Sequence, residues 1–438
     1  MRTETSSLFD PAVDGSVSTQ ELFPVEALQL YLAHLTESTA QILSSMNQTL
    51  DCYDDFLGFG YFWHQICSSF SSKEELYSQI KERKEALLSQ KEHFKTVIED
   101  RKKEDPLFYQ EVGEILTRAT LVPALRGQGG AYLAIQGPLP PFFLVKPVDE
   151  SFCCLNNHNL HGSPLLFDWL KPRPDIRFYQ SSQVEAMSYD AAVLLGLAHI
   201  TPKTILMLVE SSHFHDLSDQ IPDEGKRDFE KRTGPISKEK LCSIQEYICN
   251  AQSLQDKIQS WQAEGYVEEK IFTSVDPQDF ENMNILLWTT YDNDAHLDNF
   301  LIYEKEHDSG SSIWGLQKID NSLSFPEKNT GFSNALAFLP NAALPLSLEA
   351  KQKLQNFPLE DMQRQMERLE LHASIEALQE RVETLQALAA RDLSIYEMNL
   401  RMMALSLPQG KDLALSSCSI EHLEMLLSTH DAPILQKK

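Results

Sequence analysis

Residues that could carry out phosphoryl transfer lie in an acidic block at 292–302 and in a short motif downstream of it. Asp294 and Asn299 have the spacing Asp-x-x-x-x-Asn, and Asp320 follows an apolar run. Phosphoryl transfer needs an aspartate at the attacking hydroxyl and side-chain oxygens that hold Mg²⁺ on the phosphates. The spacing is that of a kinase catalytic loop, and Asp320 stands where a kinase has its second metal ligand. Because acidic residues are common in this chain, the Asp-x-x-x-x-Asn match is significant only together with the motifs upstream of it.

A glycine turn, a lysine and a glutamate precede the acidic block in the order that ATP binding requires. The turn consists of Gly127, Gln128, Gly129 and Gly130. Such a turn lets backbone N–H groups approach a γ-phosphate closely. Lys146, on the next strand, would contact the α- and β-phosphates, and Glu185, on a later helix, would hold this lysine by an ion pair. Each feature alone is ordinary, but their occurrence in this order is much less expected by chance.

The elements that would position these residues follow from hydrophobic periodicity and turn signals. Residues from about 20 to 118 read as helices with little strand signal. Near residue 121 the pattern changes to glycine- and proline-rich turns between short apolar runs, which indicates an antiparallel hairpin with its second strand at 142–147. The later elements expected are a helix at 183–197, a strand at 204–209, a strand or hinge at 241–248, a helix at 280–291 and helices beyond 347.

The N-terminal segment is expected to form its own helical unit. A long charged helix runs to about Glu104, and on it Ile80, Leu87 and Phe94 recur every seven residues. These are too few heptads for a coiled coil, so a helical hairpin or bundle is favoured. Such a unit could dock on the rest of the chain or bind a helical partner.

Length and charge set further limits. A chain of 438 residues exceeds one typical domain, and its 42% hydrophobic and 23% charged residues are those of an ordinary globular protein. The formal net charge of −26 argues against nucleic acid and against simple adsorption to anionic membranes, although a local basic patch could still dock on a bilayer. No apolar run reaches the roughly 20 residues that would span a bilayer, and no secretory signal is recognisable.

The cysteines indicate a reducing compartment. The seven cysteines form neither a metal-ligand spacing nor a disulfide framework. We therefore expect a cytoplasmic protein, peripheral at a membrane or exported by a Sec-independent route if it leaves the cytosol. Cys153 and Cys154 form the one local cluster, which is either a pair of small loop residues or a site of reversible acylation.

The ordered motifs resemble the phosphoinositide 3-/4-kinase superfamily, and most closely the type II phosphatidylinositol 4-kinases. The resemblance extends from about 121 to 400 and leaves the helical N-terminal segment uncovered. The stretches that carry it are 142–147, 195–204, 240–248, 279–281, 292–302, 319–326 and 337–345.

This resemblance implies an α+β chain with a bilobal, protein-kinase-like fold. After a disordered stretch at 1–20 and an all-α segment at 21–118, a small antiparallel β-rich N-lobe would span 119–248. A helical C-lobe would span 249–405, and a helical tail 406–438. The implied ligands are ATP and Mg²⁺, with ATP between the lobes.

The resemblance also implies a role for each motif residue. Lys146 would bind phosphate and Glu185 would pair with it. Asp294 would be the catalytic aspartate, with Asp298 holding its loop, and Asn299 and Asp320 would bind Mg²⁺. The residues whose backbone would meet the adenine at the hinge are Gln245, Glu246, Tyr247 and Ile248.

Three departures from the family pattern leave the acceptor open. Ala295 replaces the usual arginine after Asp294, and Ser322 replaces the glycine of Asp-Asn-Gly. Lys328 is the only basic residue between Asp320 and Leu339, where lipid kinases usually supply bases to the inositol phosphate or the membrane. Phosphatidylinositol is the first acceptor expected, a protein hydroxyl the second, and a pseudokinase that only binds is the third alternative.

Overall fold

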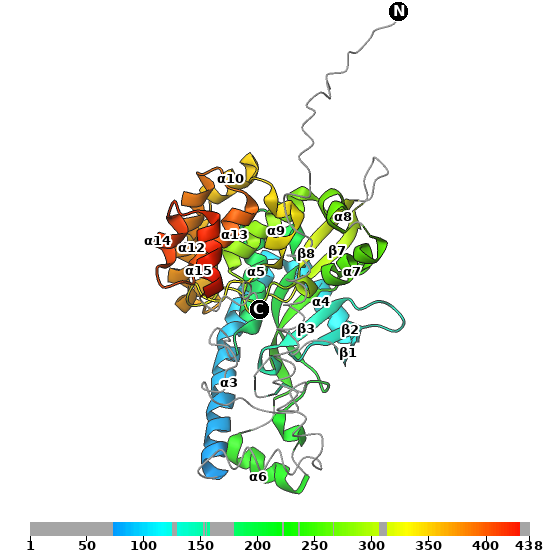
Figure 1. The fold of residues 1–438 in the computed structure, drawn as a ribbon. Helices are drawn as coiled ribbons and strands as arrows, with labels where there is room; N and C mark the ends of the chain where they lie inside the picture. Colours follow the sequence, from blue (N-terminus) through cyan, green and yellow to red (C-terminus); the bar gives the residue numbers. More distant parts are fainter. Residues whose placement is uncertain are drawn as a thin grey trace, which may run out of the picture.

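The computed structural model describes residues 73–124, 129–151, 154, 156–157, 179–220, 223–234, 237–265, 267–305 and 313–429 (Figure 1). The structure combines an antiparallel sheet of five strands with a smaller sheet and many helices, so the α+β class is confirmed. The predicted disordered stretch at 1–20, the helices expected before residue 73, Gly127, Gln128 and Cys153 lie outside the described ranges. Within those ranges, no helix combines the length and apolarity needed to cross a membrane.

The larger sheet has the order β1-β2-β3-β5-β4, with every neighbouring pair antiparallel. Its strands are β1 (Thr120–Pro123), β2 (Tyr132–Ile135), β3 (Phe143–Pro147), β4 (Thr204–Glu210) and β5 (Glu239–Glu246). The predicted hairpin corresponds to β2 and β3, while β1 was not expected. Side chains alternate between the two faces of a strand, so Phe143 and Val145 of β3 are buried on one face and Lys146 lies on the other.

Helix α5 (Ser181–Leu194) packs against β4 and β5 and corresponds to the helix predicted at 183–197. It is buried around most of its circumference, including the polar residues Gln183, Glu185 and Ser188. A helix with this pattern lies inside a core rather than on its surface. It ends before Gly196, which has a left-handed φ of 70° that glycine adopts without strain.

The smaller sheet has the order β6-β7-β8 and consists of β6 (Gln252–Ser253), β7 (Phe300–Lys305) and β8 (Ile313–Lys318). Strands β7 and β8 are antiparallel, with Phe300 opposite Lys318. The residue that precedes β7 therefore lies at the same end of the pair as the residues that follow β8. This register brings Asn299 close to Ile319 and Asp320.

Helices form the remainder of the structure beside the smaller sheet (Figure 1). Helix α9 (Pro277–Thr290) is capped by Asp276, has proline at its first position and is buried along nearly all its length. The others on this side are α7 (Leu254–Glu264), α8 (Val267–Ser274), α10 (Leu348–Gln355), α11 (Leu359–Arg368), α12 (Ile375–Ala389), α13 (Ile395–Ala404), α14 (Gly410–Leu415) and α15 (Ile420–Thr429). Short 3₁₀ turns lie at Val148–Glu150, Ala198–Ile200, Leu217–Gln220, Leu297–Asn299, Ala335–Phe338, Pro340–Ala343 and His372–Ser374.

Helices α3 (Lys73–Glu104) and α4 (Pro106–Arg118) belong to the same apolar core as the five-stranded sheet. Phe94, Val97 and Ile98 of α3 are buried in this core. The N-terminal half of α3 extends away from it and packs on α6 (Asp223–Thr233), as Figure 1 shows. In its described part, the N-terminal segment is therefore continuous with the core and does not form a separate bundle.

Candidate functional site

The predicted lysine and glutamate form an ion pair. Strand β3 directs Lys146 toward α5, and the Lys146 Nζ lies 2.5 Å from the Glu185 Oε1. The Glu185 side chain is only 1% exposed. A buried carboxylate is costly unless it is paired, so the position of Glu185 depends on the lysine.

Lys146 also contacts Asp320 from the smaller sheet, at 3.2 Å between Nζ and Oδ1. Burial lowers the pKa of Lys146, but the Asp320 and Glu185 carboxylates outweigh that effect and raise it above its ordinary value. In return, the Lys146 ammonium lowers the pKa of Asp320 to about 2. Asp320 has a left-handed φ of 55°, an uncommon conformation that sets the direction of its side chain at the end of β8. One ammonium thus joins carboxylates from α5 and from the end of β8.

Asp294 and Asn299 are held together by the turn that precedes β7. The Asn299 Nδ2 donates to the Asp294 backbone oxygen at 2.8 Å and to its Oδ2 at 3.4 Å. The Ile319 N–H donates to the Asn299 backbone oxygen at 2.9 Å, which links this turn to the residue before Asp320. The structure therefore assembles Lys146, Glu185, Asp294, Asn299 and Asp320 through a continuous set of contacts.

Two oxygens in this assembly suit a Mg²⁺ ion. The Asn299 amide nitrogen faces Asp294, and the Asp320 Oδ1 is used by Lys146 and by the Ser322 hydroxyl at 3.3 Å. Among the described residues, the Asn299 Oδ1 and the Asp320 Oδ2 accept no hydrogen bond. No group of three His, Cys, Asp or Glu side chains there could hold a metal by itself. Mg²⁺ commonly takes one or two protein oxygens and completes its shell with phosphates and water, so this pair fits it.

Asp298 is exposed, with 62% of its side chain accessible. His296 lies between it and the candidate catalytic aspartate, with Nδ1 at 3.9 Å from the Asp298 Oδ2 and Nε2 at 3.8 Å from the Asp294 Oδ2. Asp298 therefore lies beside the loop next to His296, a residue to which no role was assigned from the sequence.

The predicted hinge is partly occupied by protein contacts. Gln245 is buried within β5, and its side chain donates to the Thr204 hydroxyl at 3.4 Å. The Glu246 N–H donates to the Lys203 oxygen at 2.9 Å, and the Tyr247 N–H donates to the Phe142 oxygen at 3.0 Å. These two N–H groups are unavailable to a base unless the chain moves. The N–H of Ile248, which follows β5, remains for the contact that was expected of the hinge.

Gly130 has a packing role that the sequence did not indicate. Its N–H donates to the Glu150 backbone oxygen at 2.6 Å. A Cβ at this position would lie 2.6 Å from the Glu150 Cβ, so glycine is needed for the two segments to approach. The Gly130 N–H is thus directed at the protein rather than at a phosphate. Gly129 is described next to it, while the first half of the turn is not.

The two departures beside the acidic residues have structural counterparts. Ala295 is fully buried and forms a bridge with Asn334, and its oxygen accepts the Ala335 N–H at 2.9 Å. The charged side chain of an arginine could not remain at this fully buried position. Ser322 uses its hydroxyl on Asp320, a bond that glycine could not make.

Asp292 and Lys318 form a fully buried ion pair that sequence reasoning missed. The Lys318 Nζ lies 3.0 Å from the Asp292 Oδ2, and both side chains are 0% exposed. Asp292 belongs to the acidic block and Lys318 ends β8, two residues before Asp320. Asp292 lies in the loop between α9 and β7, so its pairing with Lys318 depends on the tertiary fold, which residue spacing does not encode.

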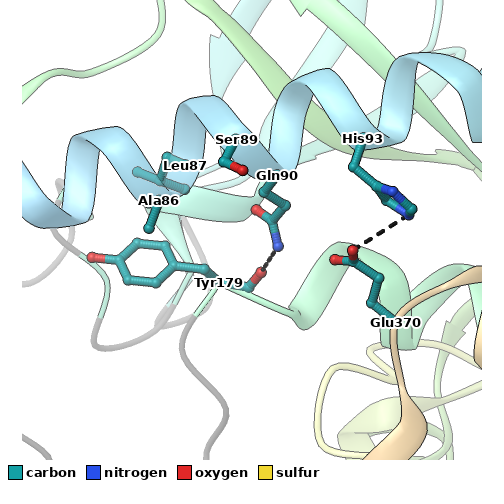
Figure 2. Close-up of a pocket in the computed structure, with 7 residues that line it drawn as sticks. All are labelled: Ala86, Leu87, Ser89, Gln90, His93, Tyr179 and Glu370. Carbon is teal, nitrogen blue, oxygen red and sulfur yellow. Dashed lines mark hydrogen bonds and ion pairs between the residues drawn. The ribbon is translucent and has the colours of Figure 1, made fainter.

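A hollow of ≈ 320 Å³ lies on α3, with none of the predicted site residues in its lining. The Gln90 amide donates to the Tyr179 oxygen at 2.8 Å, and the His93 Nε2 lies 3.4 Å from the Glu370 Oε1. Figure 2 shows both contacts beside the hollow. The lining residues are Ala86, Leu87, Ser89, Gln90, His93, Tyr179 and Glu370. Tyr179 adjoins residues outside the described ranges, so we assign no ligand to this hollow.

Comparison with known proteins identifies no family for the chain. None of the models of known protein families matches it, and no curated protein matches it either. The functional argument therefore depends on the geometry of the assembled residues.

Proposed function

We propose that this chain is a Mg²⁺- and ATP-dependent kinase related to the phosphoinositide 3-/4-kinases. The observation that carries the proposal is the position of Lys146, whose ammonium contacts Glu185 at 2.5 Å and Asp320 at 3.2 Å. In kinases a strand lysine must pair with a helix glutamate beside the metal-binding aspartate for phosphoryl transfer to proceed. Here the three residues come from β3, α5 and the end of β8.

The proposed fold is bilobal and protein-kinase-like. The five-stranded sheet with α5 would be the small lobe, and the smaller sheet with α7–α15 the large lobe. The chain passes from one to the other after β5, at the predicted hinge. ATP would bind beside Lys146 and Asp320, which lie 3.2 Å apart.

Each residue would have a separate task in the transfer. The Asp294 carboxylate would orient the acceptor hydroxyl and take its proton as the oxygen bonds to the γ-phosphorus. The bond between that phosphorus and the β,γ-bridging oxygen breaks, and ADP leaves with the electron pair. Lys146 would neutralise the α- and β-phosphates, and Asn299 with Asp320 would hold Mg²⁺, which supplies charge neutralisation at the phosphates.

Phosphatidylinositol is the first acceptor that we propose, on the basis of the motif resemblance. A protein hydroxyl is the second, and the charges around the site favour it. Asp298 and Glu327 are exposed, and Lys328 is the only basic residue of the segment that follows Asp320. A segment with so few basic residues is electrostatically less suited to an anionic lipid surface than to a protein.

The test is transfer of labelled γ-phosphate from Mg·ATP to phosphatidylinositol vesicles and, in parallel, to proteins of a cell lysate. Asp294→Ala and Asp320→Ala are expected to lower transfer by at least about 100-fold, because each removes charge or a ligand at the reacting phosphate. Chelation of Mg²⁺ with EDTA should abolish transfer, and added Mg²⁺ should restore it. Label in lipid selects the first acceptor, and label in protein alone selects the second. A wild-type chain that binds ATP but labels nothing would refute the kinase proposal.

A further inference from the structure

The buried Asp292–Lys318 pair lies at the junction of the two loops that carry the candidate catalytic and metal-binding residues. The Lys318 Nζ donates to the backbone oxygens of Ile319 at 2.7 Å and Asp320 at 3.1 Å, in addition to its 3.0 Å contact with Asp292. These bonds fix the backbone turn in which Asp320 has a positive φ.

The Asp292 carboxylate fixes the other loop. Its Oδ1 accepts the Asp294 N–H at 2.7 Å, and its Oδ2 accepts the Ser324 hydroxyl at 3.1 Å. The Asp292 backbone oxygen also accepts the Ser333 N–H at 3.1 Å. One carboxylate therefore holds the backbone of Asp294 and the segment that follows Asp320.

Stability alone does not explain two charges that are 0% exposed. A buried ion pair loses hydration on both partners, and apolar residues of similar size often serve equally well. Here the charged groups of the pair hydrogen-bond to the backbone of Asp294, to the backbone of Ile319 and Asp320, and to the Ser324 hydroxyl. A displacement of about 1 Å at a reacting group can lower the rate about 100-fold. Contacts that hold the backbone of Asp294 and Asp320 in place would therefore protect the rate of transfer.

We propose that Asp292 and Lys318 are positioning residues that set the distance between Asp294 and Asp320. Neither touches a substrate, and both act through the backbone of the residues that do. This role presupposes the proposed kinase activity and names the part of the fold that aligns its two acidic groups.

The experiment compares Lys318→Met, Asp292→Asn and the double variant with the wild type. Urea unfolding gives stability, and turnover of Mg·ATP, with water or phosphatidylinositol vesicles as acceptor, gives kcat and KM. Each single variant should lose stability because it leaves one buried charge unpaired, and the double variant should regain most of it. All three should show kcat lowered by about 100-fold with KM for Mg·ATP changed by less than about 3-fold.

Lys305→Met is the matched control. Lys305 lies on β7 of the same sheet, and its Nζ is 2.7 Å from both the Asp276 and the Asp279 carboxylates, away from the candidate site. This substitution should lower stability while leaving kcat unchanged. Ser324→Ala removes one hydrogen bond to Asp292 without leaving a charge unpaired, so a folded variant is expected, with kcat lowered several-fold.

Four results would overturn the positioning role. They are a double variant that regains both stability and kcat, a control that loses kcat as strongly as Lys318→Met, a Ser324→Ala variant with full kcat, and failure of all three Asp292 and Lys318 variants to fold. An inactive wild type would instead refute the kinase proposal, and the positioning role with it. The wild-type measurement alone separates these two cases.

Discussion

At the scale of single residues, Lys146 joins the two sides of the candidate site. Its ammonium bridges the buried Glu185 of α5 and Asp320, which follows β8 of the smaller sheet. The sequence predicted this lysine, its glutamate and the three polar residues downstream, because their types and order are characteristic of one chemistry. The Asp292–Lys318 pair could not be predicted, since it joins a loop residue to the end of β8 through the tertiary fold rather than through spacing along the chain.

Replacement of Glu185 with glutamine tests whether the Lys146–Glu185 ion pair contributes to phosphoryl transfer. The substitution keeps the shape of the side chain but removes the charge that holds Lys146, so we expect kcat for phosphoryl transfer to fall by about 100-fold. Steady-state kinetics with Mg·ATP measures the effect. Glu376→Gln, at an exposed position of α12, is the control and should have wild-type kinetics. Equal kcat values for Glu185→Gln and wild type would show that the pair has no part in transfer.

Gly130→Ala tests whether this glycine serves packing or phosphate binding. The new Cβ would lie 2.6 Å from the Glu150 Cβ and 2.8 Å from the Glu150 oxygen. We expect the free energy of unfolding to fall by about 1–3 kcal/mol, as in other overpacked sites. Gly113→Ala, in α4 with no atom within 4 Å of its new Cβ, should instead raise it by about 0.5–1 kcal/mol. Urea unfolding of both variants decides the question, and a weaker affinity for ATP with unchanged stability would contradict the packing role.

At the scale of elements, the orientation of α5 determines whether Glu185 reaches Lys146. The outer side of α5 is held by α3, where the Arg101 guanidinium forms two hydrogen bonds with the Asp190 carboxylate. Periodicity predicted α5 and most strands of the larger sheet, because their buried residues recur regularly. It missed β1, which has only four residues, one of them buried, and therefore shows no alternation.

Asp190→Asn tests this support of α5. The substitution leaves the nearly buried Arg101 guanidinium without its counter-charge, so the free energy of unfolding should fall by about 3 kcal/mol. Because α5 is then held less firmly, kcat should also fall. Glu99→Gln breaks an exposed pair with Lys102 on the same helix and should leave both quantities unchanged. If Asp190→Asn lost stability but kept the wild-type kcat, the Arg101–Asp190 pair would stabilise the fold without affecting catalysis.

At the scale of the whole molecule, α3 packs in the same core as the five-stranded sheet, although the sequence analysis assigned the two to separate units. Residues up to 118 were expected to form their own unit, because their helical pattern contrasts with the strands that follow. The apolar stripe of α3 gave no sign of its partner, which could be another helix, the sheet or a second protein. In the structure this stripe completes the core of the five-stranded sheet, with Phe94 fully buried.

Phe94→Ala tests whether α3 and the sheet unfold together. We expect the free energy of the main unfolding transition to fall by about 3–5 kcal/mol, because a buried aromatic ring is replaced by a cavity in a shared core. Leu88→Ala, at a position of α3 that is 54% exposed, should change it by less than about 0.5 kcal/mol. Urea unfolding followed by tryptophan fluorescence measures both. An unchanged main transition in Phe94→Ala would mean that α3 folds independently.

The contacts of α3 with both sides of the candidate site have a kinetic consequence. The helix binds β5 through Lys91 and Glu239, and it meets the end of α11 through the pairs His93–Glu370 and Glu104–Arg368. The pairs with α11 are largely exposed, and exposed ion pairs are weak and screened by salt. Helix α3 would then link the two sides of the candidate site only weakly, because breaking its exposed ion pairs with α11 costs little free energy. For the proposed kinase reaction, we therefore expect the dissociation rate of ADP to increase with ionic strength. The rate constant of phosphoryl transfer should not change.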